Sequence, residues 1–178
     1  MQTCIGPSEE HVSMAGIPTE ASILDMVERA MPGRVQNVYA HSSGGGKFIA
    51  VIQFKKTVPS DEGRQRQAAL LAFSAFPELK QVILVDEDVD IFDTNDVLWA
   101  MTTRTQADVD IVTIPGVRCH PLDPSNDPAC SWSIRDHGIA CKTIYDATIP
   151  FNQKARLQRA KFMEVDVKKF LPDFTVQD

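Results

Sequence analysis

The sequence of 178 residues has no long apolar run and no excess of basic residues. A membrane-spanning helix requires about 18 or more consecutive apolar residues, so we expect no membrane span. The formal net charge of -6 argues against nucleic-acid binding, which depends on clustered lysine and arginine. The first ten residues contain neither a basic region nor an apolar core, unlike a secretory signal peptide. We therefore expect a cytoplasmic protein.

Cysteine is also scarce, and no two cysteines have the Cys-x-x-Cys spacing. In a cytoplasmic chain we expect all four to be free thiols. Four possible zinc ligands lie within twenty residues, but they lack the short fixed spacings of zinc sites, so we predict no metal. The cysteines are Cys4, Cys119, Cys130 and Cys141, and the rejected ligand set is Cys119, His120, Cys130 and His137.

What the sequence does contain is a composition typical of one soluble globular domain, with 43% hydrophobic and 24% charged residues. Periodicity and turn residues predict an alternation of helices and strands. The fold class that follows is α/β (α+β), a mixed β-sheet flanked by helices. The predicted helices cover residues 18–31, 62–75, 94–103 and 153–161, and the predicted strands cover residues 35–40, 48–54, 82–85, 109–114 and 139–147.

Local residue chemistry refines this pattern at three places. Pro18 is expected in the first turn of the first helix, and Ser60 or Asp61 is expected to cap the second. Glycines between the first two strands predict a hairpin turn. A phosphate-binding loop is rejected there because His41 and Phe48 occupy the positions that need glycine and serine or threonine.

Acidic residues follow the strand at residues 82–85. Asp86, Asp88 and Asp90 alternate, so an extended backbone would place them on one side, as in a site for a hard cation. A strand end that opens into a turn is favoured over this alternative, with Asp93 capping the helix that follows. Trp99 on that helix is expected to belong to the core.

Basic residues are assigned mainly structural roles. Arg104 and Arg118 follow apolar elements and are expected to pair with the acidic run, with carboxylate or phosphate binding as the alternative. Four basic residues of the predicted C-terminal helix are expected to form a solvated face or a subunit contact. They are Lys154, Arg156, Arg159 and Lys161.

The histidines are scattered, and only His120 lies in a loop at the end of a buried strand, where functional residues are common. Spacing reveals no Ser-His-Asp or Cys-His arrangement and no pair of glutamates suited to acid–base catalysis.

Several motifs together resemble the C-terminal domain of the UbiD family of reversible aromatic acid decarboxylases. The resemblance rests on residues 82–93, 96–100 and 103–104, and continues through Val117-Arg118, residues 121–124, Ile139-Ala140 and residues 146–148. Residues 6–10 and Gly16 are similar to the family's join between a central flavin domain and this domain. The expected organisation is therefore a junction remnant at 1–17, an α/β domain at 18–150 and a helical tail at 151–178.

The resemblance implies a cofactor that this chain is not expected to hold. Family members bind prenylated FMN with manganese and potassium, and they move protons through a Glu-Arg-Glu network. Those residues belong to the flavin domain, which is expected to lie upstream of this chain. No catalytic, metal-binding or cofactor-binding residue can be carried over.

What the resemblance does assign is part of a pocket wall. The loop containing Arg118, His120, Pro121 and Leu122 resembles the family loop that closes over the substrate ring, and Ala15 is expected near the same pocket. His120 favours a polar substrate such as a hydroxylated benzoate. The family's C-terminal domain also makes a dimer contact, so a homodimer or higher homo-oligomer is expected.

The expected function is therefore the dimerisation and substrate-lid part of a UbiD-type decarboxylase that acts on an aromatic acid and is inactive alone. The first alternative is a stand-alone partner subunit or interaction module that binds a chain with a flavin domain. The second is a repurposed small enzyme that uses the loop at residues 118–122.

Overall fold

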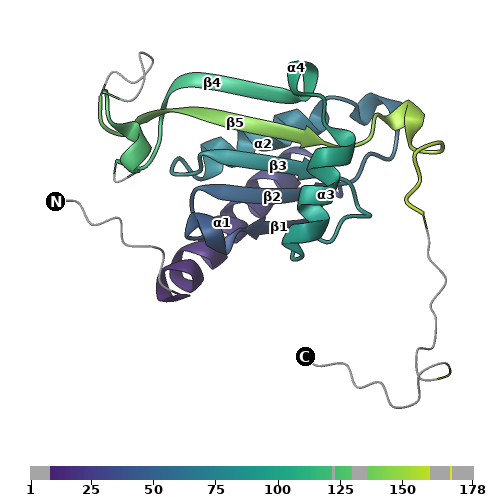
Figure 1. Cartoon of the computed structure of the whole chain (residues 1–178), viewed down its shortest axis with the longest axis horizontal. Helices are drawn as coiled ribbons and strands as arrows, with labels where there is room; N and C mark the ends of the chain where they lie inside the picture. The colour runs from purple at the N-terminus through teal and green to yellow at the C-terminus, as the bar shows by residue number, and fades with distance from the viewer. Residues whose placement is uncertain (1–8, 122, 130–135, 161–168, 170–178) are drawn as a thin grey trace.

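The computed structural model describes residues 9–121, 123–129, 136–160 and 169. Its centre is a five-stranded sheet in the order β1-β2-β3-β5-β4, with helices on both faces (Figure 1). This confirms the predicted mixed sheet flanked by helices. The helices are α1 (Glu9–Ala30), α2 (Arg64–Ala75), α3 (Thr94–Arg104) and α4 (Ala107–Asp110), and the strands are β1 (Val35–Ala40), β2 (Ile49–Phe54), β3 (Gln81–Val85), β4 (Ile111–Arg118) and β5 (Ile139–Ala147).

The three central strands are parallel, and the two edge strands run antiparallel to their neighbours. β1 and β2 form the predicted hairpin. β4 pairs with β5, and its register shifts between Ile114 and Val117, where Pro115 lacks a backbone N–H. All three parallel strands therefore point their amino ends to one edge of the sheet and their carboxyl ends to the other (Figure 1).

Alternating apolar residues in the central strands build a separate core on each face of the sheet. Ile52 and Leu84 pack with α1 and α2, which lie behind the sheet in Figure 1. Val51, Ile83 and Val85 pack on the other face, which α3 covers. Because each central strand buries both faces, its sequence is almost continuously apolar.

Helix α1 begins nine residues before the predicted start, at Glu9. The prediction that Pro18 opens the helix is therefore wrong. Proline cannot donate to the carbonyl four residues back. Hydroxyl groups bind nearby carbonyls: Thr19 Oγ1 donates to Ala15 O at 2.6 Å and Ser22 Oγ donates to Pro18 O at 2.7 Å.

Other predicted boundaries also need correction. α2 begins after Gly63, whose φ of 88° only glycine adopts readily, so Ser60 and Asp61 do not cap it. β4 begins at Ile111, because residues 107–110 form the helical turn α4. The predicted helix at 153–161 is wrong over its described part, which contains only the 3-10 turn Phe151–Gln153 followed by turns and bends. No helix in the described part of the chain has the length and apolarity to cross a membrane.

Candidate substrate-lid site

The segment predicted to form the substrate lid, residues 118–122, is called the lid loop; its first residue, Arg118, ends β4 at the amino edge of the parallel strands. Cys119 N donates to Gly138 O at 2.7 Å, and Arg118 Nη1 lies 3.4 Å from the carbonyl oxygen of His137. A Cβ on Gly138 would lie 3.0 Å from Arg118 Nη1, and its φ is 81°. The turn before β5 therefore needs glycine to accommodate the lid loop.

His120 is held through both its backbone and its ring. Its carbonyl accepts hydrogen bonds from Asn126 Nδ2 at 2.8 Å and Asp123 N at 3.1 Å. Its ring meets Phe48 edge-on with centroids 5.9 Å apart, and Nε2 lies 3.6 Å from Glu78 Oε1. The last distance is that of a close polar contact and exceeds a hydrogen bond. The side chain is 16% exposed, so it remains accessible to a ligand.

Charged groups support the residues that follow the lid loop. Lys80 Nζ donates to Asp123 Oδ2 at 2.8 Å and also binds the Ser125 hydroxyl. Burial raises the pKa of Asp123, but the hydrogen bonds from Lys80 and Ser125 outweigh it and hold the pKa below its ordinary value. The ionised carboxylate also accepts from Ser125 N at 3.0 Å, which caps the turn Pro124–Asn126.

Two buried groups lie behind the lid loop. Cys119 Sγ donates to Glu78 O at 3.3 Å, and burial raises the pKa of this thiol. Lys142 Nζ donates to Pro77 O at 2.7 Å and lies 4.9 Å from the centroid of the Phe73 ring. Burial lowers the pKa of this amine. Both thiol and amine anchor the turn between α2 and β3.

The structure places the predicted pocket residues as follows. Arg118, His120 and Pro121 lie in the lid loop, whereas Leu122 falls outside the described residues. Ala15 reaches the same edge of the sheet through α1, where its neighbour Gly16 packs against Gly46 in the loop before β2; a Cβ on Gly46 would lie 2.8 Å from Gly16 N.

Sequence reasoning missed Phe48, Glu78 and Lys80. They lie 40 to 72 residues from His120 in sequence, and no local pattern marks them. Only the pairing of β2 with β3 and of β3 with β5 brings these segments together.

The opposite edge carries the acidic rim, defined here as Asp86, Glu87, Asp88, Asp90 and Asp93. Arg104 Nη1 and Nη2 bind the Asp88 carboxylate at 2.9 and 2.6 Å, and Nη1 lies 3.4 Å from Asp86, which confirms the predicted pairing for Arg104. Asp93 accepts from Asn95 N at 2.9 Å and caps α3 as predicted. Arg118 lies at the other edge, so its predicted pairing with this rim is wrong.

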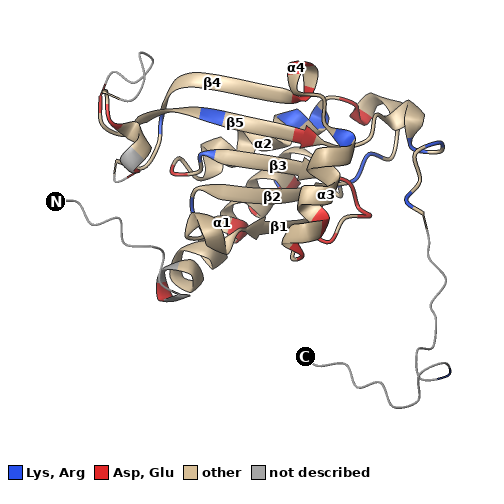
Figure 2. Cartoon of the chain, in the orientation of Figure 1, with Lys and Arg blue, Asp and Glu red and all other residues tan. Residues whose placement is uncertain are grey.

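The basic strap, residues 150–160, crosses this acidic edge (Figure 2). Lys154 Nζ lies 3.3 Å from Asp86 and 2.9 Å from Glu87, and Arg159 Nη1 donates to Asp96 at 2.9 Å. Arg159 is 42% exposed, as a solvated face requires, but both residues also form ion pairs within the chain.

Ionisation at this edge follows these contacts. The bidentate bond from Arg104 lowers the pKa of Asp88, whereas burial raises the pKa of Asp86 despite its basic neighbours. In the part of the chain that the structure describes, no group of three or more His, Cys, Asp or Glu residues could hold a metal ion.

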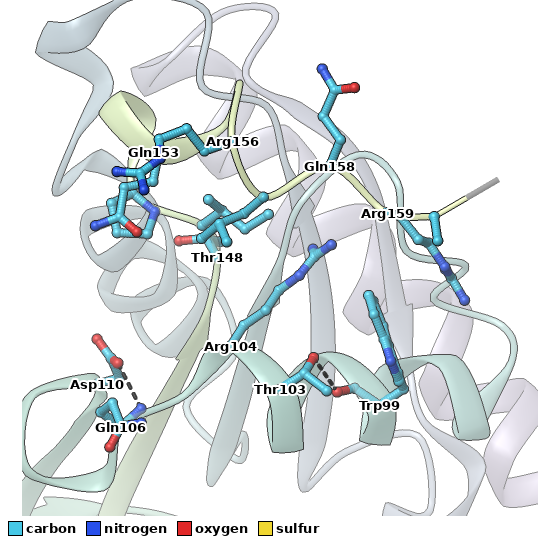
Figure 3. Close-up of a pocket in the computed structure, with 14 residues that line it drawn as sticks. Trp99, Thr103, Arg104, Gln106, Asp110, Thr148, Gln153, Arg156, Gln158 and Arg159 are labelled. Atoms are coloured by element: carbon cyan, nitrogen blue, oxygen red, sulfur yellow. Dashed lines mark hydrogen bonds between the residues drawn. The ribbon is translucent and has the colours of Figure 1, made fainter.

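A cavity of about 520 Å³ lies between α3 and the basic strap (Figure 3). Trp99 is only partly buried: it packs against the core and also faces Arg159 at 4.4 Å and Arg104 at 4.9 Å from its ring. In Figure 3 the Arg104 side chain extends from α3 toward the strap, and Arg156 lies on the strap side. Arg104 and Arg159 are paired with Asp88 and Asp96 by the ion pairs above.

Known proteins share this sequence and this fold. The family model of the 3-octaprenyl-4-hydroxybenzoate carboxy-lyase C-terminal domain matches residues 12–147, which include most of α1 and the whole sheet. Gallate decarboxylase of Lactiplantibacillus plantarum is 61% identical over 173 residues, which cover 96% of this chain and 35% of that protein.

Solved structures agree in fold. The apo 3,4-dihydroxybenzoic acid decarboxylase from Enterobacter cloacae superposes with a TM-score of 0.88 at 62% identity, covering 94% of this chain and 34% of that one. The UbiD-class enzyme HmfF from Pelotomaculum thermopropionicum, in complex with FMN, superposes with a TM-score of 0.79 at 33% identity, covering 94% and 35%. This chain thus spans about a third of the length of the relatives it matches.

Proposed function

From the premise that the chain belongs to the UbiD family, as its carboxy-lyase C-terminal domain, we propose that it is the substrate-lid part of an aromatic acid decarboxylase. The observation that carries the proposal is the identity of 61% with gallate decarboxylase and 62% with 3,4-dihydroxybenzoic acid decarboxylase, each over more than nine-tenths of the chain. Both names specify ring-hydroxylated aromatic acids, and the proposed substrate is of that class.

The lid loop supplies one wall of the proposed pocket. We assign Arg118, His120, Pro121 and Leu122, with Ala15 from α1, to this wall because the family resemblance implies it. The loop excludes water from the reacting carboxylate, and His120 offers a polar group to a ring hydroxyl. Arg118 offers a guanidinium to a carboxylate, since its one described hydrogen bond uses a single donor, Nη1.

The cofactor of the proposed enzyme is prenylated FMN, which an evolved dimeric form of HmfF binds. The family resemblance implies manganese and potassium beside this cofactor. We propose that a flavin-binding domain of the kind found in the family holds the cofactor and both ions. The residues present here hold the lid and do not carry the chemistry.

The proposed organisation follows the same division. Residues 1–17 join the flavin-binding domain, residues 18–150 form the lid domain, and residues 151–178 form a tail. We also propose that the domain forms a homodimer or a higher homo-oligomer, as the family resemblance implies. The proposed location is the cytoplasm, with no membrane or nucleic-acid partner.

A chimera tests the proposal. The matching C-terminal third of the L. plantarum gallate decarboxylase is replaced with this chain, and the product is loaded with prenylated FMN and manganese. Release of CO2 from gallate at a rate within about tenfold of the parent supports the proposal, since core and site are largely shared at this identity. A soluble, flavin-loaded chimera that releases no CO2 contradicts it. So does CO2 release by the 178-residue chain alone.

The second candidate is a separate lid subunit that binds a flavin-domain chain. The discriminating experiment supplies this chain in trans to a parent enzyme that lacks its C-terminal third. Restored gallate decarboxylation with co-purification of both chains identifies the separate subunit, whereas activity only in the fused chimera supports the first proposal.

A further inference from the structure

The geometry points to Glu78 as a positioning residue that holds the His120 ring in the orientation used by the lid. This inference rests on the proposed function, because it concerns the same pocket. Glu78 comes from the turn between α2 and β3, and Oε1 lies 3.6 Å from His120 Nε2. No contact in the catalytic scheme proposed above uses this carboxylate.

The backbone that carries Glu78 is fixed on two sides. Its own carbonyl accepts from the Cys119 thiol at 3.3 Å, and the preceding carbonyl of Pro77 accepts from Lys142 Nζ at 2.7 Å. Lys142 is only 3% exposed, so its amine is committed to this turn. The backbone at Glu78 is therefore held in place by hydrogen bonds, although the Glu78 side chain is 36% exposed.

The carboxylate lies between two side chains. Lys47 Nζ lies 3.4 Å from Oε2, and His120 Nε2 faces Oε1. At 3.6 Å the Glu78–His120 approach is a close polar contact that is longer than a hydrogen bond. The other nearby charges have their own described contacts, Lys80 with Asp123 and Arg118 with a carbonyl.

The His120 ring also meets the Phe48 ring edge-on, with centroids 5.9 Å apart. His120 thus contacts an apolar ring and a fixed negative charge, while its backbone is held by Asn126. This arrangement selects one orientation of the imidazole. A fixed polar group in the lid favours substrates that carry a ring hydroxyl at the matching position over their methyl ethers.

The direct test is side-chain NMR on the 178-residue chain, labelled at histidine. Glu78→Gln removes the charge and keeps the shape, and Lys47→Gln removes the charge of the neighbouring lysine as a matched control. We expect one His120 χ1 rotamer in the wild type and in Lys47→Gln. In Glu78→Gln we expect averaging toward about one third per staggered well. Unchanged rotamers in Glu78→Gln, or equal averaging in both variants, overturns the inference.

The same substitutions in the chimera give a kinetic readout. If the competent orientation falls to about one third, KM for gallate rises about threefold. We expect kcat to change less than about twofold, since a positioning residue does not enter the chemical step. A fall in kcat with constant KM overturns the positioning role. An inactive chimera contradicts the proposed function only, because the NMR result decides the role of Glu78 independently.

Discussion

Substitution of Asp61 is the most direct test of the contacts that stabilise this fold. Its carboxylate is fully buried and accepts hydrogen bonds from Thr57 N at 2.8 Å, Thr57 Oγ1 at 3.2 Å and Val58 N at 3.1 Å. Arg34 Nε, just before β1, lies 3.0 Å from Oδ1 as an ion pair, without the angle of a hydrogen bond. One side chain therefore ties the turn after β2 to the start of β1.

The expected cost of Asp61→Ala follows from these contacts. Removing one member of a buried ion pair costs about 3–5 kcal/mol, because the remaining groups stay buried without partners. Arg34 is 23% exposed and regains some water, so we expect a loss near the lower end, about 3 kcal/mol of unfolding free energy. For a chain of this size, each kcal/mol lowers Tm by about 2–4 °C, which gives about 9 °C.

The pH dependence of this effect has a defined sign. Burial raises the pKa of Asp61, but the hydrogen bonds from Thr57 and Val58 and the Arg34 contact outweigh it, so the pKa is lowered. A lowered carboxyl pKa means that the stabilisation is complete above the unfolded pKa of about 3.9 and is lost as the pH falls through the folded value. The difference between wild type and Asp61→Ala should therefore be constant near neutrality and shrink below about pH 4.

Urea and thermal unfolding followed by circular dichroism measure both quantities. Asp25→Ala is the control, because Asp25 pairs with Arg29 on exposed helix surface and should change the unfolding free energy by less than about 0.5 kcal/mol. A loss of unfolding free energy below about 1 kcal/mol for Asp61→Ala would refute the role of Asp61 in joining the turn after β2 to β1, since removal of a buried, paired carboxylate should cost more.

Three further substitutions or measurements test other contacts. Gly46→Ala should destabilise the fold by about 2 kcal/mol or more in urea unfolding, because the φ of Gly46 is 66° and an added Cβ would lie 2.8 Å from the backbone of α1. The control Gly33→Ala, with a φ of 72° and open space around it, should cost only about 1 kcal/mol. Equal costs for the two variants would contradict the contact between Gly46 and α1. Lys154→Ala should raise amide hydrogen exchange in the basic strap by about threefold, and no change would mean that its ion pairs do not hold the strap. Peptide-resolved alkylation at pH 8 should label Cys119 about tenfold more slowly than Cys141, because burial raises the Cys119 pKa; similar rates would show that the lid loop opens readily.

Sequence predicted the elements whose signals are local. The apolar runs at 48–54 and 82–85 became β2 and β3, and Asp93 capped α3 because an aspartate before a helical stretch satisfies the first free N–H groups. The first hairpin also followed from its glycines. These features depend on residues within one or two turns of each other.

Features that depend on distant residues were not predictable in the same way. Local signals also mislead at Pro18, which normally marks a helix start, whereas α1 runs through it from Glu9. The ion pairs of Lys154 and Arg159 join residues more than 60 positions apart, so the basic stretch alone resembled an exposed helix. For the lid, the sequence indicated the loop but not Glu78 behind it.

The bulge in β4 has a consequence for how the protein behaves in concentrated solution. β4 borders the sheet, and an exposed edge normally offers a row of unpaired N–H and C=O groups to strands of other molecules. Pro115 has no backbone N–H to donate, and the register shift between Ile114 and Val117 interrupts the regular spacing of the strand. The strand that leads into the lid loop thus ends the sheet in a form that is a poor template for intermolecular β-aggregation.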